Sequence, residues 1–312
     1  MQLQKASRKK VKIKMSLASP TGFGKTISAL LIAYGMTDDW SKIAVIDTEN
    51  ESASLYANHQ LLNGFIIGEF QTISLSPPYE PEKYSKAIKL CEDDGSIEVI
   101  IVDSITHVWQ GQGGLLEYNT SLGSNTFQNW AKTTPRYQKW LNSILQSKCH
   151  VITTSRKKQA YALVEDNGKK KVEKQGMEDQ IRDGYDYEMT IAFEIINDQH
   201  MARPAKYRTG LFADKPEFVI TSETGKIILT WCNTGKDALQ AVKIDVLERI
   251  KECKTKEELL KLYYSDPPVE ENIINAFTRR KAELEQQSKT PILNNNLTQN
   301  SNGTIRNTAT NK

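Results

Sequence analysis

Eight residues, Ser19-Pro-Thr-Gly-Phe-Gly-Lys-Thr26, constrain the fold of this chain more than any other feature. They follow an alternating apolar segment at residues 11–18, typical of a strand, and they precede apolar residues at helical spacing. Such a loop wraps its backbone N–H groups around phosphate oxygens, its lysine reaches the β- and γ-phosphates, and its threonine hydroxyl binds Mg²⁺. The segment therefore predicts a P-loop. Its nucleotide-binding residues are Ser19, Pro20, Thr21, Gly22, Phe23, Gly24, Lys25 and Thr26.

The first position of this loop departs from the usual pattern, which begins with glycine. Here it is Ser19, so the turn must suit a residue with a Cβ atom. We expect the departure to affect the affinity for nucleotide rather than binding itself. The alternative is a glycine-rich turn that binds no ligand.

A second apolar segment, Lys42-Ile-Ala-Val-Ile-Asp47, predicts a buried parallel strand. Parallel strands deliver functional residues at their carboxyl ends, so the residues after Asp47 are expected near the nucleotide. Glu49 is the candidate general base, because a carboxylate beside the γ-phosphate can orient the attacking water and take its proton. The alternative is an acid at a helix start or a surface charge.

Residues 97–104 form another buried-strand pattern, which reaches an acid at Asp103. Apolar residues followed by Asp are typical of a Walker B strand, whose carboxylate holds Mg²⁺. Such runs are common in α/β proteins, but this one follows a P-loop and an intervening strand and helix. We therefore expect Asp103 and Thr26 to hold the metal.

Aromatic residues and a histidine follow this strand. His107 can sense a γ-phosphate or serve as a structural hydrogen-bonding residue, and Trp109 can stack on a base or cover the core. The segment 126–148 predicts a long helix with an interruption at Pro135. The next strand pattern, 149–155, ends beside Arg156, where a γ-phosphate sensor is expected.

A basic hairpin is predicted around Asn167-Gly168, which joins two β-like segments. Residues 156–182 hold eight Lys or Arg against five Asp or Glu. Together with Tyr161, this favours a loop that attracts the phosphates of single-stranded DNA and stacks on its bases. A solvated structural hairpin is the alternative.

Lys206 and Arg208 lie two residues apart in a predicted extended segment, so their side chains project to the same side. Such a pair can clamp a phosphate, in the same site or in that of a neighbouring subunit. Solvent-facing strand charges are the alternative.

Length and composition predict one large domain with an appendage, because the chain has 312 residues of which 38% are apolar. We expect a P-loop ATPase domain at residues 1–235, a helical appendage at 236–287 and a disordered tail at 288–312. The net charge of +3 does not indicate nucleic acid by itself. A basic arm at the N-terminus is either solvated or in contact with phosphate, and it includes Lys5, Arg8 and Lys9.

The four cysteines are widely spaced and favour neither zinc nor disulfides, which fits a reducing cytoplasm. We see no signal-peptide core and no apolar window long enough to span a bilayer. A cytoplasmic protein without a membrane partner is expected.

Taken together, residues 5–231 resemble the RecA-like P-loop ATPases, and in particular the small AAA family ATPases of bacteriophages and mobile elements. The segments that carry the resemblance are Ser28–Ala33, Ile46–Tyr56, Val102–Gly111 and Lys206–Gly210. The resemblance implies a RecA-like α/β core with a mainly parallel sheet, an inserted β-hairpin and a small C-terminal helical appendage. It also implies ATP and Mg²⁺ as cofactors and a homo-oligomer.

The resemblance places Glu49 where RecA proteins carry the acid that activates water. It places residues 109–124 and 157–180 where that family binds single-stranded DNA, although the residues differ. Lys206 and Arg208 resemble the Lys-x-Arg fingers of ring-forming RecA-like helicases.

Two functions from different classes follow. The first is an ATPase that acts on single-stranded DNA in phage-type recombination or repair, with single-strand-binding or recombination proteins as further partners. The second is a nucleotide-gated loader or scaffold whose slow hydrolysis times its release from a protein partner. A small-molecule kinase is disfavoured, because no lid-like arginine cluster is evident. DNA-stimulated turnover distinguishes the first two.

Overall fold

The computed structural model describes residues 10–166, 169–213, 215, 217–234, 246–265 and 271–287. The chain divides into two units, Met1–Lys236 and Asp237–Lys312. The predicted basic arm with Lys5, Arg8 and Lys9 and the predicted tail at residues 288–312 lie outside the described residues.

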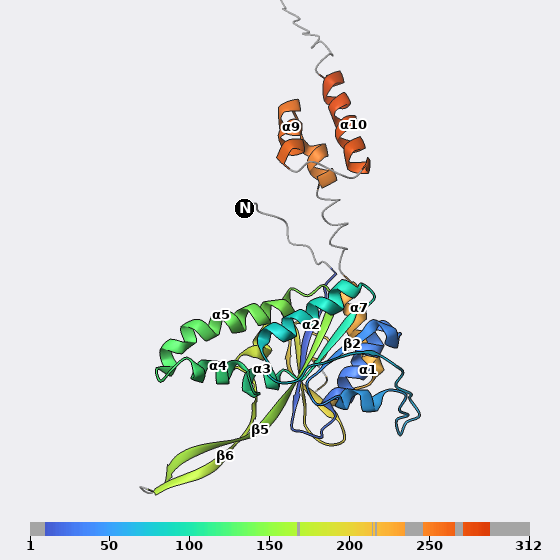
Figure 1. Cartoon of the computed structure of the whole chain (residues 1–312). Helices are drawn as coiled ribbons and strands as arrows, with labels where there is room; N and C mark the ends of the chain where they lie inside the picture. The colour runs from blue at the N-terminus through green and yellow to red at the C-terminus, as the bar shows by residue number, and fades with distance from the viewer. Residues whose placement is uncertain are drawn as a thin grey trace, which may run out of the picture. The chain divides into compact units, whose positions relative to one another are not determined.

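The first unit is an α/β fold around a mainly parallel sheet (Figure 1). In the described residues the strand order is β3-β2-β4-β5-β1-β7-β8-β9, and β6 pairs with β5. Pairing is parallel from β3 to β7 and antiparallel from β7 to β9. Strand β5 thus pairs with both β1, which leads into the P-loop, and β4, which ends at Asp103. The strands are β1 (Lys14–Ser19), β2 (Ile43–Asp47), β3 (Gln71–Ser74), β4 (Val99–Asp103), β5 (His150–Asp166), β6 (Lys169–Asp179), β7 (Ile191–Ile195), β8 (Met201–Tyr207) and β9 (Phe218–Val219).

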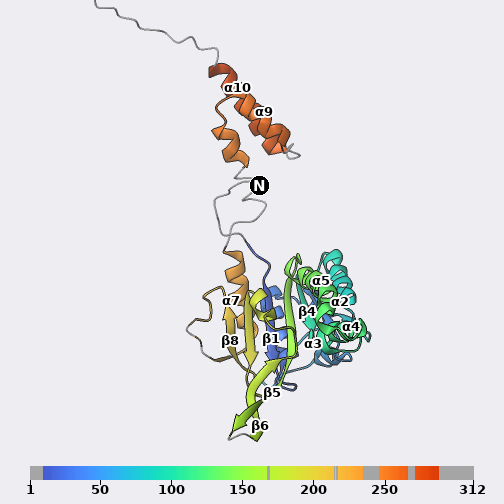
Figure 2. The ribbon, with the colours of Figure 1, turned by 90° about the vertical axis from the view of Figure 1, so that its left-hand side faces the viewer.

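Helices cover both faces of this sheet, α1 and α7 on one face and α2 and α5 on the other (Figure 1 and Figure 2). Strands β2 and β4 are apolar up to their final aspartates, as expected for strands that are buried on both faces. Val45 and Ile101 pack on the side of α1, whereas their neighbours Ile46 and Val102 pack on the side of α2. The helices of this unit are α1 (Lys25–Thr37), α2 (Pro81–Asp94), α3 (Thr106–Gln110), α4 (Leu115–Ser121), α5 (Thr126–Leu145), α6 (Tyr185–Glu188) and α7 (Ser222–Asn233), with 3₁₀ turns at Trp40–Lys42 and Ser52–Tyr56.

The predicted interruption at Pro135 is wrong, because α5 runs without a break and contains this proline. Its buried face includes Tyr137, Trp140 and Ile144, which pack in the core between α2, α5 and the sheet. Tertiary packing of an amphipathic face provides most of the stability of a helix in a protein. Here it offsets the loss of one backbone hydrogen bond at the proline.

Strand β5 continues beyond the sheet and forms a hairpin with β6, which projects from the rest of the first unit (Figure 1). The register runs from the pair Lys157 and Asp179 to the pair Asp166 and Lys169, with a shift between Ala160 and Tyr161. The predicted turn residues Asn167 and Gly168 lie outside the described residues. The inserted hairpin is nonetheless evident from its two paired strands.

The described part of the second unit is helical. Residues 246–252 are helical, and the helices α9 (Lys256–Ser265) and α10 (Glu271–Gln287) follow. Thr255 and Glu258 form a capping box, because the Thr255 hydroxyl accepts from the Glu258 N–H at 3.2 Å and the Glu258 carboxylate accepts from the Thr255 N–H at 3.4 Å. The core of this unit consists of Ile250, Cys253, Leu259, Ile273, Phe277 and Leu284. None of the helices in the described part of either unit has the length and apolar character that crossing a membrane requires.

Candidate nucleotide-binding site

The P-loop joins the end of β1 to the start of α1, as the sequence predicts. Gly22 and Gly24 adopt the left-handed conformation, with φ values of 88° and 86°, which glycine tolerates best. Ser19, by contrast, is the last residue of extended strand β1 and is fully buried. Extended backbone accepts a Cβ atom without strain, so the serine at the first position of the loop is compatible with this geometry.

The side chain of Lys25 folds over this loop. Its Nζ lies 3.2 Å from the Ser19 carbonyl oxygen, 3.4 Å from the Ser19 hydroxyl and 3.0 Å from the Pro20 carbonyl oxygen. Burial lowers the pKa of Lys25, and the negative charges of Asp103 and Glu49 oppose this shift. The ammonium group is therefore held by neutral oxygens that an anionic phosphate can replace.

Three polar side chains meet at the carboxyl ends of the central strands. The Thr26 hydroxyl donates to Asp103 Oδ2 at 2.5 Å, and the Thr154 hydroxyl donates to Asp103 Oδ1 at 2.5 Å. Burial raises the pKa of Asp103, and both hydrogen bonds oppose that shift. The structure thus brings together Thr26 and Asp103, as predicted, and adds Thr154 from β5.

This oxygen cluster fits Mg²⁺, because a hydroxyl and a carboxylate are the hard oxygen ligands that this ion uses beside nucleotide phosphates. No cluster of three or more His, Cys, Asp or Glu side chains that could hold a metal occurs among the described residues. An Mg²⁺ site with few protein ligands is consistent with that finding, because the ion usually keeps several waters.

Glu49 lies in the turn after β2, which the Asp47 carboxylate organises. Asp47 accepts from the Glu49 N–H at 2.6 Å and from the Ala53 N–H at 2.8 Å. The Glu49 carboxylate receives two hydrogen bonds from Arg156, one of them from Nε to Oε1 at 3.0 Å. The predicted base and the residue at the predicted sensor position therefore face one another.

In this structure His107 is a structural hydrogen-bonding residue, and Trp109 covers the core. His107 Nδ1 lies 2.8 Å from the Thr48 hydroxyl and its ring stacks on Tyr79, with a centroid distance of 4.8 Å. Burial lowers the pKa of His107. Trp109 is buried and stacks on Trp130 at 5.9 Å, so it covers the core.

His200 is a residue of this site that sequence reasoning missed. It lies in the turn between β7 and β8, and its Nδ1 is 2.9 Å from the carbonyl oxygen of Phe23 in the P-loop. A polar turn between two strands carries no spacing signal, so no local pattern connects His200 with the loop.

Lys206 and Arg208 do not lie at the P-loop of their own chain. Both donate to the Tyr187 carbonyl oxygen, Arg208 Nη2 at 2.7 Å. The Arg208 N–H bonds to Thr190, whose own N–H bonds to Lys14 at the amino end of β1. The P-loop follows the opposite end of that six-residue strand, roughly 15–20 Å away at about 3.3 Å per residue.

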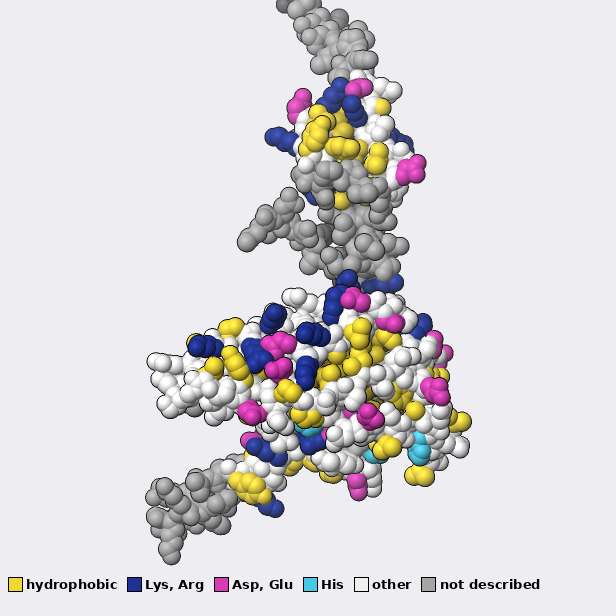
Figure 3. Space-filling model, viewed as in Figure 1, with side chains coloured by type: hydrophobic (Ala, Val, Ile, Leu, Met, Phe, Trp, Pro, Cys, Tyr) yellow, Lys and Arg dark blue, Asp and Glu magenta, His cyan; other side chains and the backbone are white. Residues whose placement is uncertain are grey.

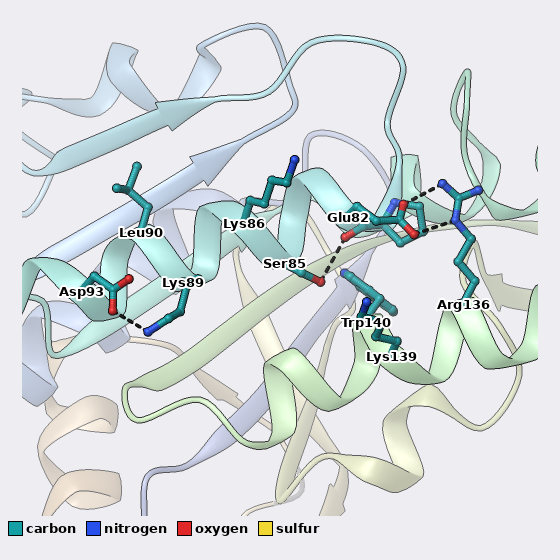
Figure 4. A pocket seen from close by; sticks show the side chains of 10 residues that line it. Glu82, Ser85, Lys86, Lys89, Leu90, Asp93, Arg136, Lys139 and Trp140 are labelled. Atoms are coloured by element: carbon teal, nitrogen blue, oxygen red, sulfur yellow. Dashed lines mark hydrogen bonds and ion pairs between the residues drawn. The ribbon is translucent and has the colours of Figure 1, made fainter.

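A cavity of about 480 Å³ lies between α2 and α5 rather than at the P-loop (Figure 4). Basic side chains gather over these helices, including Lys86, Lys89, Arg136 and Lys139 (Figure 3). Arg136 donates two hydrogen bonds to Glu82, at 2.8 Å and 2.6 Å, and Lys89 pairs with Asp93. Two of the four cations are thus engaged with acids of the same surface.

A comparison with family models agrees with this geometry. A family model described as an AAA domain matches residues 11–256. A solved structure, the KaiC-like protein PH0186 from Pyrococcus horikoshii OT3, is 13% identical, with a TM-score of 0.37 over 63% of this chain and 80% of that chain. A comparison with curated proteins finds no match.

Proposed function

Because this chain belongs to the AAA domain family, with a RecA-like P-loop core, we propose that it binds ATP with Mg²⁺, hydrolyses it and acts on single-stranded DNA. The observation that carries the nucleotide part of the proposal is the hydrogen bond from the hydroxyl of Thr26, next in sequence to Lys25, to Asp103 Oδ2 at 2.5 Å. A P-loop hydroxyl and a Walker B carboxylate at this distance are the two side chains that hold the metal in P-loop ATPases.

The residues of the chain divide the chemistry among them. The backbone N–H groups of the P-loop and Lys25 bind the phosphates. Mg²⁺, held by Thr26 and Asp103, would neutralise charge on the β- and γ-phosphates. Glu49 orients a water molecule and takes its proton as the water oxygen attacks the γ-phosphorus and ADP leaves.

For Glu49 to act in this way, Arg156 must release it. The γ-phosphate is an anion that can attract this guanidinium, and arginine binds phosphate and carboxylate with the same planar fork. We therefore propose that Arg156 changes partner when ATP binds, from Glu49 to the γ-phosphate.

The hairpin of β5 and β6 is the proposed DNA-binding element. Its first strand, β5, also carries Thr154, which bonds to Asp103, and Arg156, which bonds to Glu49. One strand thus connects the hairpin with the nucleotide site, so a movement of either can be transmitted to the other. Tyr161 is 61% exposed on this hairpin and can stack on a base.

The cations at the base of the hairpin are already engaged. Lys157 pairs with Glu194 at 2.9 Å, and Lys158 pairs with Glu178 at 2.9 Å. We therefore assign the contacts with DNA phosphates to Lys169, Lys170 and Lys171, the first three residues of β6. The backbone of these lysines pairs with residues 164–166.

A second candidate function, a nucleotide-gated loader or scaffold, is favoured by the same pair of Arg156 and Glu49. A base held by a guanidinium favours slow hydrolysis, which suits a protein that uses ATP to time its release from a protein partner.

For Lys206 and Arg208, we propose a role at the γ-phosphate of a neighbouring subunit in a homo-oligomer. Their distance from the P-loop of their own chain favours this role over one in the same site.

The test is the initial rate of phosphate release from ATP with Mg²⁺, measured with and without a thymidine homopolymer. The DNA-dependent function predicts a rate that rises with DNA and saturates. A measurable rate that DNA leaves unchanged would favour the loader or scaffold. Absence of both hydrolysis and ADP binding would contradict the nucleotide site itself.

A further inference from the structure

His200 packs against the P-loop from the turn between β7 and β8. Its Nδ1 lies 2.9 Å from the Phe23 carbonyl oxygen. An ideal Cβ atom on Gly24 would lie 2.1 Å from that Nδ1 and 2.4 Å from Cε1 of the same ring. Because no Cβ atom approaches other atoms so closely, the imidazole fills the space that a side chain at position 24 would need.

The turn that carries His200 is held in one conformation. The Asn197 side chain accepts from the N–H groups of Gln199 and Met201, each at 3.1 Å, and the His200 N–H bonds to the Asn197 carbonyl oxygen at 3.2 Å. His200 itself has a φ of 61°, a left-handed conformation that residues with a Cβ atom adopt only where the surroundings hold them. These contacts direct the ring toward the P-loop.

The hydrogen bond defines both the tautomer and the orientation of a peptide plane. A carbonyl oxygen only accepts, so the proton lies on His200 Nδ1. The peptide bond between Phe23 and Gly24 is trans, since the cis bonds of the described residues lie elsewhere. In a planar trans peptide the C=O and N–H groups point in opposite directions. Holding the Phe23 carbonyl toward His200 therefore directs the Gly24 N–H to the other side of the loop.

We propose that His200 is a positioning residue for phosphate binding, which holds the peptide between Phe23 and Gly24 so that the Gly24 N–H points at the nucleotide phosphates. The inference rests on the proposed nucleotide site, whose loop binds phosphate through its N–H groups. In the absence of nucleotide, His200 keeps the loop in its binding conformation, so that less ordering accompanies binding.

Three variants of the full chain distinguish the effect of the hydrogen bond from the effect of the left-handed backbone conformation at position 200. His200→Asn keeps a donor nitrogen on the γ-carbon, at the position of Nδ1, and tolerates left-handed backbone. His200→Gly keeps the backbone conformation and removes the donor, and His200→Ala removes the donor and disfavours that conformation. Gln199→Ala is the matched control, because this exposed side chain belongs to the same turn.

The measurement is ADP affinity by calorimetry, with the melting temperature of the nucleotide-free protein as the control for folding. We expect His200→Gly and His200→Ala to bind ADP about three- to tenfold more weakly, the effect of losing one hydrogen bond, and His200→Asn and Gln199→Ala to stay within about twofold of wild type. The KM for ATP should rise by the same factor while kcat stays within about twofold, because the contact serves ground and transition states equally.

The inference is overturned if wild type binds ADP and His200→Gly binds it equally well, whatever His200→Ala does. It is also overturned if His200→Gly and His200→Ala leave KM unchanged and lower only kcat, together with a lower melting temperature. That result would indicate a purely structural role. A wild-type protein that binds no ADP would overturn the proposed function, and this inference with it.

Discussion

Arg156 donates hydrogen bonds from Nε and Nη2 to the carboxylate of Glu49, although the two residues lie 107 positions apart in the sequence. The pair is partly buried, with 33% of the arginine side chain and 20% of the glutamate side chain exposed. Hydrogen bonds between a guanidinium and a carboxylate are among the strong ones in proteins. The proposed base is thus held by a guanidinium, and the proposed hydrolysis requires Arg156 to change partner first.

The first prediction concerns this base. Glu49→Gln should keep ATP binding and lower the hydrolysis rate at least about 100-fold, because an amide can hold a water molecule but cannot take its proton. Binding is measured by calorimetry with ATP and hydrolysis by phosphate release. Glu51→Gln, an exposed neighbour in the same turn, is the control and should behave as wild type. Loss of ATP binding in Glu49→Gln would instead assign this residue a structural role.

The second prediction concerns the neighbouring subunit. Lys25→Ala and Arg208→Ala should each be inactive alone, whereas their mixture should regain part of the activity. In mixed oligomers an Arg208→Ala subunit offers an intact P-loop, and its Lys25→Ala neighbour offers the intact arginine. Phosphate release is measured across mixing ratios, with light scattering to confirm that oligomers form. Mixtures that stay inactive while oligomers are present would argue against the role in a neighbouring subunit.

The third prediction concerns the DNA-binding hairpin. Replacing Lys169, Lys170 and Lys171 by alanine should weaken single-stranded DNA binding without regard to sequence and flatten its salt dependence, by up to about 0.7 in log–log slope for each lost phosphate contact. Fluorescence anisotropy across a salt series measures both quantities. The matched control removes the same charge from exposed positions elsewhere, with Lys132 and Lys139 of α5 and Lys148, three residues beyond its end, replaced by alanine. If the hairpin variant has the affinity and the salt slope of wild type, the hairpin has a structural role and does not bind DNA phosphates.

Tyr161 on the same hairpin should behave differently. If this exposed ring stacks on a base, Tyr161→Ala should cost about 1–3 kcal/mol of binding free energy with the salt slope nearly unchanged, because no phosphate contact is lost. The same anisotropy series distinguishes the two effects. A changed slope without a loss of affinity at low salt would exclude stacking.

The fourth prediction concerns stability at acid pH. His150 Nδ1 accepts the Ile13 N–H at 3.1 Å, and burial lowers the pKa of His150 to about 3, with Lys12 and Lys14 adding to the shift. An unfolded histidine titrates near pH 6.5, so protonation favours the unfolded state. The contribution of the neutral imidazole is fully present above about pH 6.5 and is lost as the pH falls toward 3, by about 2 kcal/mol at pH 5.

Urea unfolding at pH 7.5 and pH 5 measures this effect. His150→Asn keeps an acceptor oxygen for the Ile13 N–H and does not titrate, so its free energy of unfolding should fall less between the two pH values. An equal fall in wild type and variant would contradict the assignment to His150.

Much of this site could be predicted from the sequence because its signals are local. The P-loop is a contiguous motif, and Asp103 follows a run of apolar residues. The parallel pairing of neighbouring strands then brings their carboxyl ends to one edge, which is why Thr26 and Asp103 meet although 77 positions separate them. The hairpin was predicted in the same way, from a turn dipeptide between two strand-like segments.

The contacts that the sequence did not predict depend on pairings between distant side chains. Nothing near His200 in the sequence points to Phe23, 177 positions earlier, since their contact follows from how the turn after β7 folds over the loop. Strand order and direction likewise determine that Arg156 pairs with Glu49. They also determine that Lys206 and Arg208 lie at the end of the sheet away from the P-loop. Pro135 shows the same limit, because local propensity at one residue was outweighed by the packing of a whole helix face.

The most direct test of the nucleotide site is the rate of Mg²⁺-dependent phosphate release from ATP by wild type and by Lys25→Ala, measured with single-stranded DNA present. Lys12→Ala, which removes an exposed lysine just before β1, is the matched control for charge. We predict release by wild type and by Lys12→Ala, and none above background by Lys25→Ala, because that variant lacks the charge on the β- and γ-phosphates. A folded Lys25→Ala protein that releases phosphate at the wild-type rate would contradict the assignment of this loop as the nucleotide-binding site.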